Sequence, residues 1–127
     1  MGYEKDLDWK LMRKNKQSIA IVHVNKYDIQ GGAAKSTSRL ANIQRHLGHQ
    51  SNMLVAFKET NSENVVTFQS EPEPSIKDVC RTYGQLFYEF QGSHKLIDHP
   101  LVQSADILHL QNLHSDYFNP FSISALT

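Results

Sequence analysis

The chain lacks several features that mark common classes of protein. A single cysteine, Cys80, among 127 residues excludes an intramolecular disulfide and a cysteine-rich zinc site. Neither sign of charge is in excess, because 13 Lys and Arg balance 13 Asp and Glu, which argues against a nucleic-acid partner. No apolar run approaches the roughly 18 residues that span a bilayer, and no apolar segment near the N-terminus forms a secretory signal. The sequence therefore predicts a small, soluble, cytoplasmic domain.

Residues 1–17 differ in composition from the remainder and form a polar N-terminal extension. Acidic residues come first and basic residues follow, with four apolar side chains between them: Leu7, Trp9, Leu11 and Met12. One interpretation is an amphipathic helix that contacts an anionic membrane, which would place the protein peripherally at the inner face of the cytoplasmic membrane. The other is a frayed extension whose apolar residues touch the domain.

From residue 18 onwards, strand-like and helix-like patterns alternate. The β-branched run Ser18–Asn25 predicts a buried strand, and Asn52–Phe57 predicts a second one. Between them we expect a helix that follows Gly31-Gly32 and ends at Leu47, before Gly48. Four apolar side chains recur at helical spacing and are expected to face the sheet: Ala33, Leu40, Ile43 and Leu47.

The second half continues the alternation. A short strand is expected over Asn64–Gln69, then a helix with Ser75 as N-cap that closes near Gly92. Residues 93–104 form a connector with a short helical turn, Ala105–Leu110 a fourth strand, and Phe121–Thr127 the first turns of a helix. The predicted second helix carries an apolar stripe expected to face the core, with Cys80 as an inert buried thiol: Ile76, Val79, Cys80, Tyr83, Phe87 and Phe90.

This alternation predicts an α/β fold, a Rossmann-like parallel sheet with flanking helices. Ligands of such sheets bind beyond the carboxyl ends of the strands. Two loops are expected at that edge, Lys26–Gly32 after the first strand and Gln111–Asn119 after the fourth. The sequence therefore predicts that the functional residues lie on these two loops.

The glycine loop has the composition of an anion-binding site. Adjacent glycines allow the backbone to approach a ligand, and the helix that follows offers free N–H donors. The alternative is a tight turn that merely needs a positive φ. Lys35, Ser36 and Thr37 match the phosphate-binding loop of partition-type P-loop ATPases. However, Ala34 replaces the glycine that precedes the lysine of that motif, Gln30 replaces its signature lysine, and His109 stands where a magnesium-directing aspartate is expected.

A second resemblance covers most of residues 18–127. Its carrying segments are Ile21–Ala34, Leu47–His49 with Met53–Val55, and His99–His114 continuing into Tyr117–Asn119. On these segments the chain resembles the N-terminal half of a family 4 glycosyltransferase of the GT-B fold. Within that family it is most similar to enzymes that assemble bacterial surface polysaccharides, such as colanic acid. The resemblance implies an incomplete GT-B glycosyltransferase, with residues 18–127 as a partial acceptor-side domain.

The resemblance also implies roles for particular residues. Gly31 and Gly32 would lie under the donor diphosphate, and Lys35 would either add a positive charge there or remain solvated. Asn112, His114 and Tyr117 would line the acceptor pocket. The family often has a histidine where Gln111 stands. His109 and His114 match no standard zinc spacing, so no metal site is expected.

The implied reaction is sugar transfer from a nucleotide-sugar, which is a substrate and not a cofactor, to a lipid-linked oligosaccharide. In the family, the charged catalytic residues lie in a C-terminal domain and on a further N-domain strand, so the catalytic residues here are unknown. We expect the isolated chain to be inactive and a separate C-terminal domain to be a partner. A P-loop ATPase domain and a non-catalytic binding module are the alternatives.

Overall fold

The protein is described here from a computed structural model, which describes residues 18–127. The extension predicted over residues 1–17 lies outside the described residues. The elements follow one another in the order β1 (Ala20–Tyr27), α2 (Gly31–His46), β2 (Gln50–Phe57), β3 (Val65–Thr67), α3 (Pro74–Thr82), η1 (Gln91–Asp98), α4 (Pro100–Gln103), β4 (Ile107–Leu110), η2 (Pro120–Ser122) and α5 (Ile123–Leu126).

The strands form one parallel sheet. It has four strands in the order β3-β2-β1-β4, and every neighbouring pair is parallel. In register, His23 of β1 lies beside Met53 of β2 on one side and His109 of β4 on the other. The predicted α/β class with a parallel sheet and flanking helices is confirmed, and this strand order is consistent with a Rossmann-like fold.

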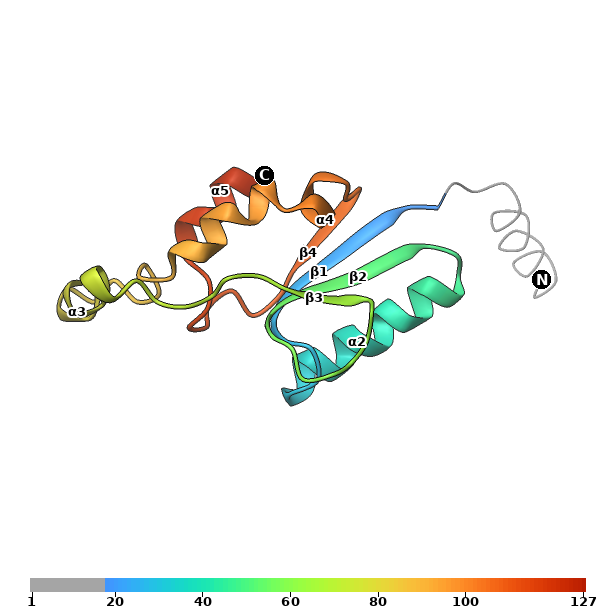
Figure 1. The fold of residues 1–127 in the computed structure, drawn as a ribbon, viewed down its shortest axis with the longest axis horizontal. Helices are drawn as coiled ribbons and strands as arrows, with labels where there is room; N and C mark the ends of the chain where they lie inside the picture. Colours follow the sequence, from blue (N-terminus) through green and yellow to red (C-terminus); the bar gives the residue numbers. More distant parts are fainter. Residues whose placement is uncertain (1–17) are drawn as a thin grey trace, which may run out of the picture.

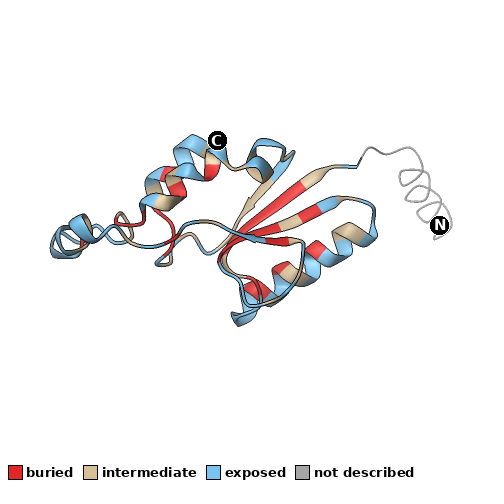
Figure 2. Ribbon diagram, viewed as in Figure 1, coloured by how far each residue is buried: buried red, intermediate tan, exposed pale blue. Residues whose placement is uncertain are grey.

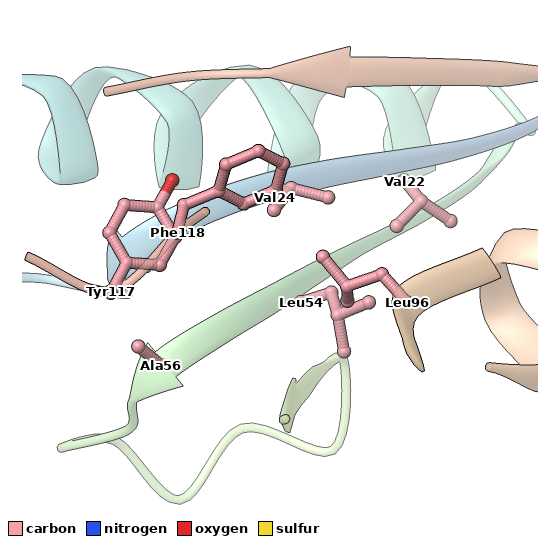
Figure 3. Packing of buried hydrophobic residues seen from close by; sticks show 7 residues of the cluster. All are labelled: Val22, Val24, Leu54, Ala56, Leu96, Tyr117 and Phe118. Atoms are coloured by element: carbon pink, nitrogen blue, oxygen red, sulfur yellow. The ribbon is translucent and has the colours of Figure 1, made fainter. Parts of the chain in front are cut away.

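Helical segments cover both faces of the sheet. α2 lies along one face, and the segment from η1 to α5 lies on the opposite side (Figure 1). The face opposite α2 carries the larger hydrophobic cluster, in which Tyr117 and Phe118 join residues of β1, β2 and η1 (Figure 3). A smaller cluster lies under α2: Ala41, Met53, Val55 and Val65.

The face of α2 that packs on the sheet differs from the prediction. Ala34, Thr37 and Ala41 are buried there, whereas all four predicted side chains are exposed: Ala33, Leu40, Ile43 and Leu47. Small residues let the helix axis approach the sheet closely. The prediction, which relied on the spacing of the large apolar residues, therefore placed the wrong face against the sheet. The predicted end of the helix is confirmed, since Leu47 is the C-cap and Gly48 has a φ of 94°.

The second predicted helix is also corrected. α3 begins after the N-cap Glu73 with Pro74 in its first turn, and not at Ser75. It ends at Thr82 because Gly84 adopts a φ of 69° just beyond the C-cap, and the chain does not continue as a helix to Gly92. α3 projects away from the sheet and is mostly exposed (Figures 1 and 2).

The prediction that an apolar stripe along this segment faces the core is wrong, because the helix ends at Thr82 and α3 does not pack against the sheet. Tyr83 is 77% exposed and Val79 is 54% exposed. Cys80 and Phe90 are buried, and the buried thiol of Cys80 agrees with its predicted structural role. The four predicted strands occur as β1 to β4, and the third is shorter than predicted, because β3 covers Val65–Thr67 and not Asn64–Gln69.

Candidate functional site

The two candidate loops leave neighbouring strands at the same edge of the sheet. β1 leads into the loop before α2, and β4 leads into the loop that contains Asn112. β1 and β4 are paired directly, and the strand order reverses between them, because β2 and β3 lie on the other side of β1. A reversal of this kind opens a crevice at the carboxyl ends of the strands, where open α/β sheets bind ligands.

The glycine loop leaves the start of α2 accessible. Gly31 has a φ of 86°, which favours glycine, and a Cβ added to Gly31 or Gly32 would meet no atom within 4 Å. The N-cap residue Gln30 makes no capping hydrogen bond with its side chain, and the first turn carries no acidic residue. The first N–H groups of this 16-residue helix therefore remain available to an anionic ligand. Lys35 is exposed one turn further along.

A buried donor lies near the carboxyl end of β1. Asn25 is near the carboxyl end of β1 and only 1% exposed, and its Oδ1 accepts a hydrogen bond from the backbone N–H of Lys26 at 2.8 Å. Its Nδ2 is buried and has no hydrogen-bond partner. A buried amide donor without an acceptor is costly, and such groups call for a ligand or a water molecule.

Asp28 connects the glycine loop to the segment that follows β2. Its carboxylate accepts hydrogen bonds from the backbone N–H groups of Glu59 and Thr60, both at 3.0 Å, and from the Thr60 hydroxyl at 2.6 Å. Burial alone would raise the pKa of Asp28, but the hydrogen bonds from Thr60 and Glu59 outweigh it and hold the pKa below its usual value. Asp28 thus ties the end of β1 to the segment that follows β2.

An ion pair bridges the two candidate loops. Lys26, which ends β1 together with Tyr27, pairs with Asp116 in the loop after β4. The hydrogen bond from Lys26 lowers the pKa of Asp116, and the same hydrogen bond raises the pKa of Lys26. The Lys26 side chain is 18% exposed and that of Asp116 is 64% exposed, so solvent screens the pair and it contributes little stability. The pair brings the end of β1 into contact with the loop after β4.

A chain of polar side chains runs between α2 and the sheet towards this edge. His23, 1% exposed, lies with its Nε2 2.8 Å from Gln44 Oε1 and its Nδ1 2.9 Å from His109 Nδ1. Gln44 also accepts from the Ser51 hydroxyl at 2.7 Å. At the other end, His109 Nε2 lies 3.5 Å from Gln111 Nε2, and the Thr37 hydroxyl contacts Gln111 Oε1.

The direction of this hydrogen-bond chain is fixed when both imidazoles are neutral. Because Gln44 Oε1 accepts from His23 Nε2, His23 Nδ1 is bare and must accept from His109 Nδ1. His109 Nε2 is then bare and faces the amide N–H of Gln111. Burial is the main cause that lowers the pKa of His23, the electrostatic influence of His109 and Arg45 adds to it, and the hydrogen bond to Gln44 opposes it. The neutral chain therefore couples the middle of β1 to the start of the Gln111 loop.

The three predicted acceptor residues occupy different environments. Asn112 is exposed and adopts a φ of 52°, and His114 is also exposed on the same loop. Tyr117 is 0% exposed and donates its hydroxyl to Gln111 O at 2.7 Å, and burial raises the pKa of this phenol. Asn112 and His114 are thus available to a ligand, whereas Tyr117 supports the loop from within the core.

The geometry separates the two phosphate-binding patterns raised by the sequence. Only three residues separate the end of β1 from Gly31, where α2 begins, so Lys35 lies inside the helix and no long loop wraps ahead of it. A P-loop needs such a wrap to surround the phosphates. Within residues 18–127, no group of three or more His, Cys, Asp and Glu side chains could hold a metal ion.

Comparison of the chain with protein-family models, with curated proteins and with solved structures gave no match. None of the helices in residues 18–127 has the length and apolar character needed to cross a membrane.

Sequence reasoning did not identify Asp28 or the His23–His109 pair as structural features of this edge. For His23 a signal was present, because a histidine inside an otherwise apolar strand needs a polar partner when it is buried. His23 stands in such a strand, Ala20–Tyr27. The partner Gln44 could not be found from sequence, because α2 packs through its small residues.

Proposed function

We propose that residues 18–127 form the acceptor-side half of a glycosyltransferase of the GT-B type, which transfers a sugar from a nucleotide-sugar to a lipid-linked oligosaccharide of a bacterial surface polysaccharide. The observation that carries the proposal is the position of the two loops named by the resemblance. The Gly31-Gly32 loop and the Asn112–His114 loop follow the two strands between which the strand order reverses.

In this proposal the glycine loop receives the donor diphosphate. The open space above Gly31 and Gly32 and the uncapped start of α2 support contact between a phosphate group and backbone N–H groups. These donors would stabilise the negative charge that develops on the departing diphosphate. Lys35, exposed one turn along α2, supplies a cation close to the same place.

The exposed side chains of the second loop serve the acceptor. Asn112 offers an amide donor and acceptor and His114 an imidazole, the groups that a sugar hydroxyl can meet. The ion pair between Lys26 and Asp116 shows that this loop lies next to the end of β1, where the glycine loop begins. A second Rossmann-like domain that faces this edge would hold the nucleotide and supply the charged catalytic groups.

The proposal is tested with an acceptor in solution. The ¹⁵N-labelled chain is titrated with a polyprenyl-diphosphate-linked disaccharide in detergent micelles, and amide chemical shifts are followed. We expect shifts over residues 111–119 that an Asn112→Gly, His114→Ala double variant reduces several-fold; glycine keeps the positive φ at position 112. A Glu63→Ala variant, altered at an exposed site elsewhere, serves as the control. Equal shifts in both variants, or shifts with empty micelles alone, would overturn the proposal.

The resemblance to a P-loop ATPase receives less support. The short connection between Tyr27 and Gly31 leaves no room for the wrap that this motif needs. Magnesium-dependent ATP binding that is lost in Lys35→Ala would restore that alternative.

A further inference from the structure

A hollow lies beside the candidate site, between the end of β2, the segment after β3 and the arm that contains α3. Its volume is about 330 Å³, which is at the lower end of the range for small-molecule sites. Asp116, the partner of Lys26, forms part of its wall, so the hollow borders the loop after β4. No role proposed above uses this hollow.

One wall carries a largely buried glutamate, one of whose carboxylate oxygens has no hydrogen-bond partner. Glu89 lines the hollow and is only 6% exposed. Its Oε2 is buried and has no hydrogen-bond partner, and no cation of residues 18–127 lies within ion-pairing distance of it. An ionised carboxylate in this position is costly unless a cation or several donors reach it. The position of Glu89 therefore calls for a ligand that carries a positive, hydrogen-bond-donating group.

Charges of the opposite sign line the same hollow. Lys77 and Arg81 both contribute to its wall, and they lie four residues apart on α3, so they share one side of that helix. Neither forms an ion pair in the described part of the chain. Together with the exposed carboxylate of Glu71, the unpaired charges around the hollow balance, two of each sign. A ligand that carries one charge of each sign fits this arrangement better than a simple anion or cation.

The remaining wall is aromatic and apolar. Phe57, Leu86, Phe87 and Phe90 line it, and phenyl faces attract a cation through their ring quadrupole. Phe87 adopts a φ of 74°, a conformation that is strained for a bulky residue and needs support from its surroundings. The Phe87 ring lines the hollow and offers an apolar surface to the body of a ligand.

From these three walls we infer that the hollow binds a small zwitterion with an apolar body, such as an amino acid. Its ammonium group meets Glu89, its carboxylate meets Lys77 and Arg81, and its apolar part lies against the phenyl rings. The binding is independent of glycosyl transfer at the neighbouring loops.

Three matched probes test this inference on the full chain by calorimetry and by amide chemical shifts. L-phenylalanine carries both charges, 2-phenylethylamine only the ammonium, and 3-phenylpropionate only the carboxylate. We expect L-phenylalanine to bind most tightly and 3-phenylpropionate most weakly, with shifts over residues 86–90 and not over residues 31–34. Glu89→Gln should weaken the two amines by roughly tenfold to a hundredfold, as expected for loss of a charged hydrogen bond.

Two further variants distinguish the contacts of the ligand's carboxylate from those of its ammonium group. Arg81→Gln, at an exposed position, should weaken L-phenylalanine and leave 2-phenylethylamine unchanged, and Glu63→Gln, outside the hollow, should change neither. Glu89→Gln removes an unpartnered buried charge with little change in shape, so the fold should be retained, which circular dichroism checks. Absence of binding by any probe, equal binding of all three, or amine binding unaffected by Glu89→Gln would overturn the inference.

Discussion

Among single residues, Asp28 has the clearest structural role at the carboxyl edge of the sheet. It is 1% exposed and accepts three hydrogen bonds from Glu59 and Thr60. All of its donors come from the segment after β2, so the carboxylate links two neighbouring connections at the edge where the glycine loop begins.

Asp28→Asn should lower the free energy of unfolding by about 2 kcal/mol, because the amide N–H₂ cannot accept and leaves one or two of the donors of Glu59 and Thr60 unsatisfied. Urea denaturation at neutral pH measures the change. Asp78→Asn, at an exposed position of α3, is the matched control and should change stability by less than about 0.5 kcal/mol. A loss in Asp28→Asn no larger than in this control would contradict the role of Asp28.

His23 makes the free energy of unfolding depend on pH. Its pKa in the folded protein lies below the ordinary 6.5 of a histidine, so the unfolded chain binds the proton more readily. Stability from this residue is therefore complete above pH 6.5 and is lost as the pH falls from there through the lower folded pKa. Protonated His23 would donate from both ring nitrogens, so His109 Nδ1 would have to accept. His109 Nε2 would then carry the hydrogen, and the Gln111 amide would have to rotate so that its oxygen faces that nitrogen.

We expect the free energy of unfolding to rise between about pH 5 and pH 7, and His23→Gln to remove most of that slope. His114→Gln, at an exposed position, should leave the slope unchanged. Denaturation curves collected across this range measure both. An unchanged slope in His23→Gln would show that another group is responsible.

At the level of elements, α2 shows how a helix can pack through its small side chains. Ala34 and Ala41 are buried at 2% and 1% exposure, whereas Ile43 is 54% exposed. The close approach also allows Gln44 to reach His23. A larger side chain at Ala41 would separate the helix from β2.

Ala41→Leu should therefore destabilise the protein by about 1–3 kcal/mol, since overpacking strains a filled interface. Ile43→Ala, on the exposed side, should cost less than about 1 kcal/mol. Thermal and urea denaturation compare the two variants. The reverse order would mean that the large apolar side chains face the sheet after all.

The elements also show which features the sequence can predict. β1, β2 and β4 were expected because short apolar runs of strand length stand between turn signals, and the end of α2 followed from Gly48. The sequence did not predict the end of α3, although Gly84 marks it, because apolar residues continue at helical spacing beyond that glycine. Periodicity alone cannot show whether a stripe meets a core or solvent.

At the scale of the whole molecule, pairing of distant strands creates the candidate site. The alternation of strands and helices predicted a common edge for the two loops, but the order β3-β2-β1-β4 and the reversal at β1 became visible only in the fold. The contacts that bridge the loops could not be predicted either, since Lys26 and Asp116 are 90 residues apart and Thr37 and Gln111 are 74 apart.

The central claim is that the start of α2 at this edge binds a diphosphate, and Gly32→Asp tests it most directly. Gly32 has no positive φ and open space around its Cα, so an aspartate fits and should stabilise the helix by about 0.3–1 kcal/mol through the helix dipole. The same carboxylate repels an anionic ligand.

The decisive measurement is a titration of the ¹⁵N-labelled chain and of Gly32→Asp with uridine diphosphate, guanosine diphosphate and inorganic pyrophosphate. We predict amide shifts over residues 31–34 in the wild-type chain, and at least about a tenfold loss of affinity in a variant that is as stable as the wild type or more so. Shifts absent from residues 31–34, or equal affinity in the two proteins, would contradict the account.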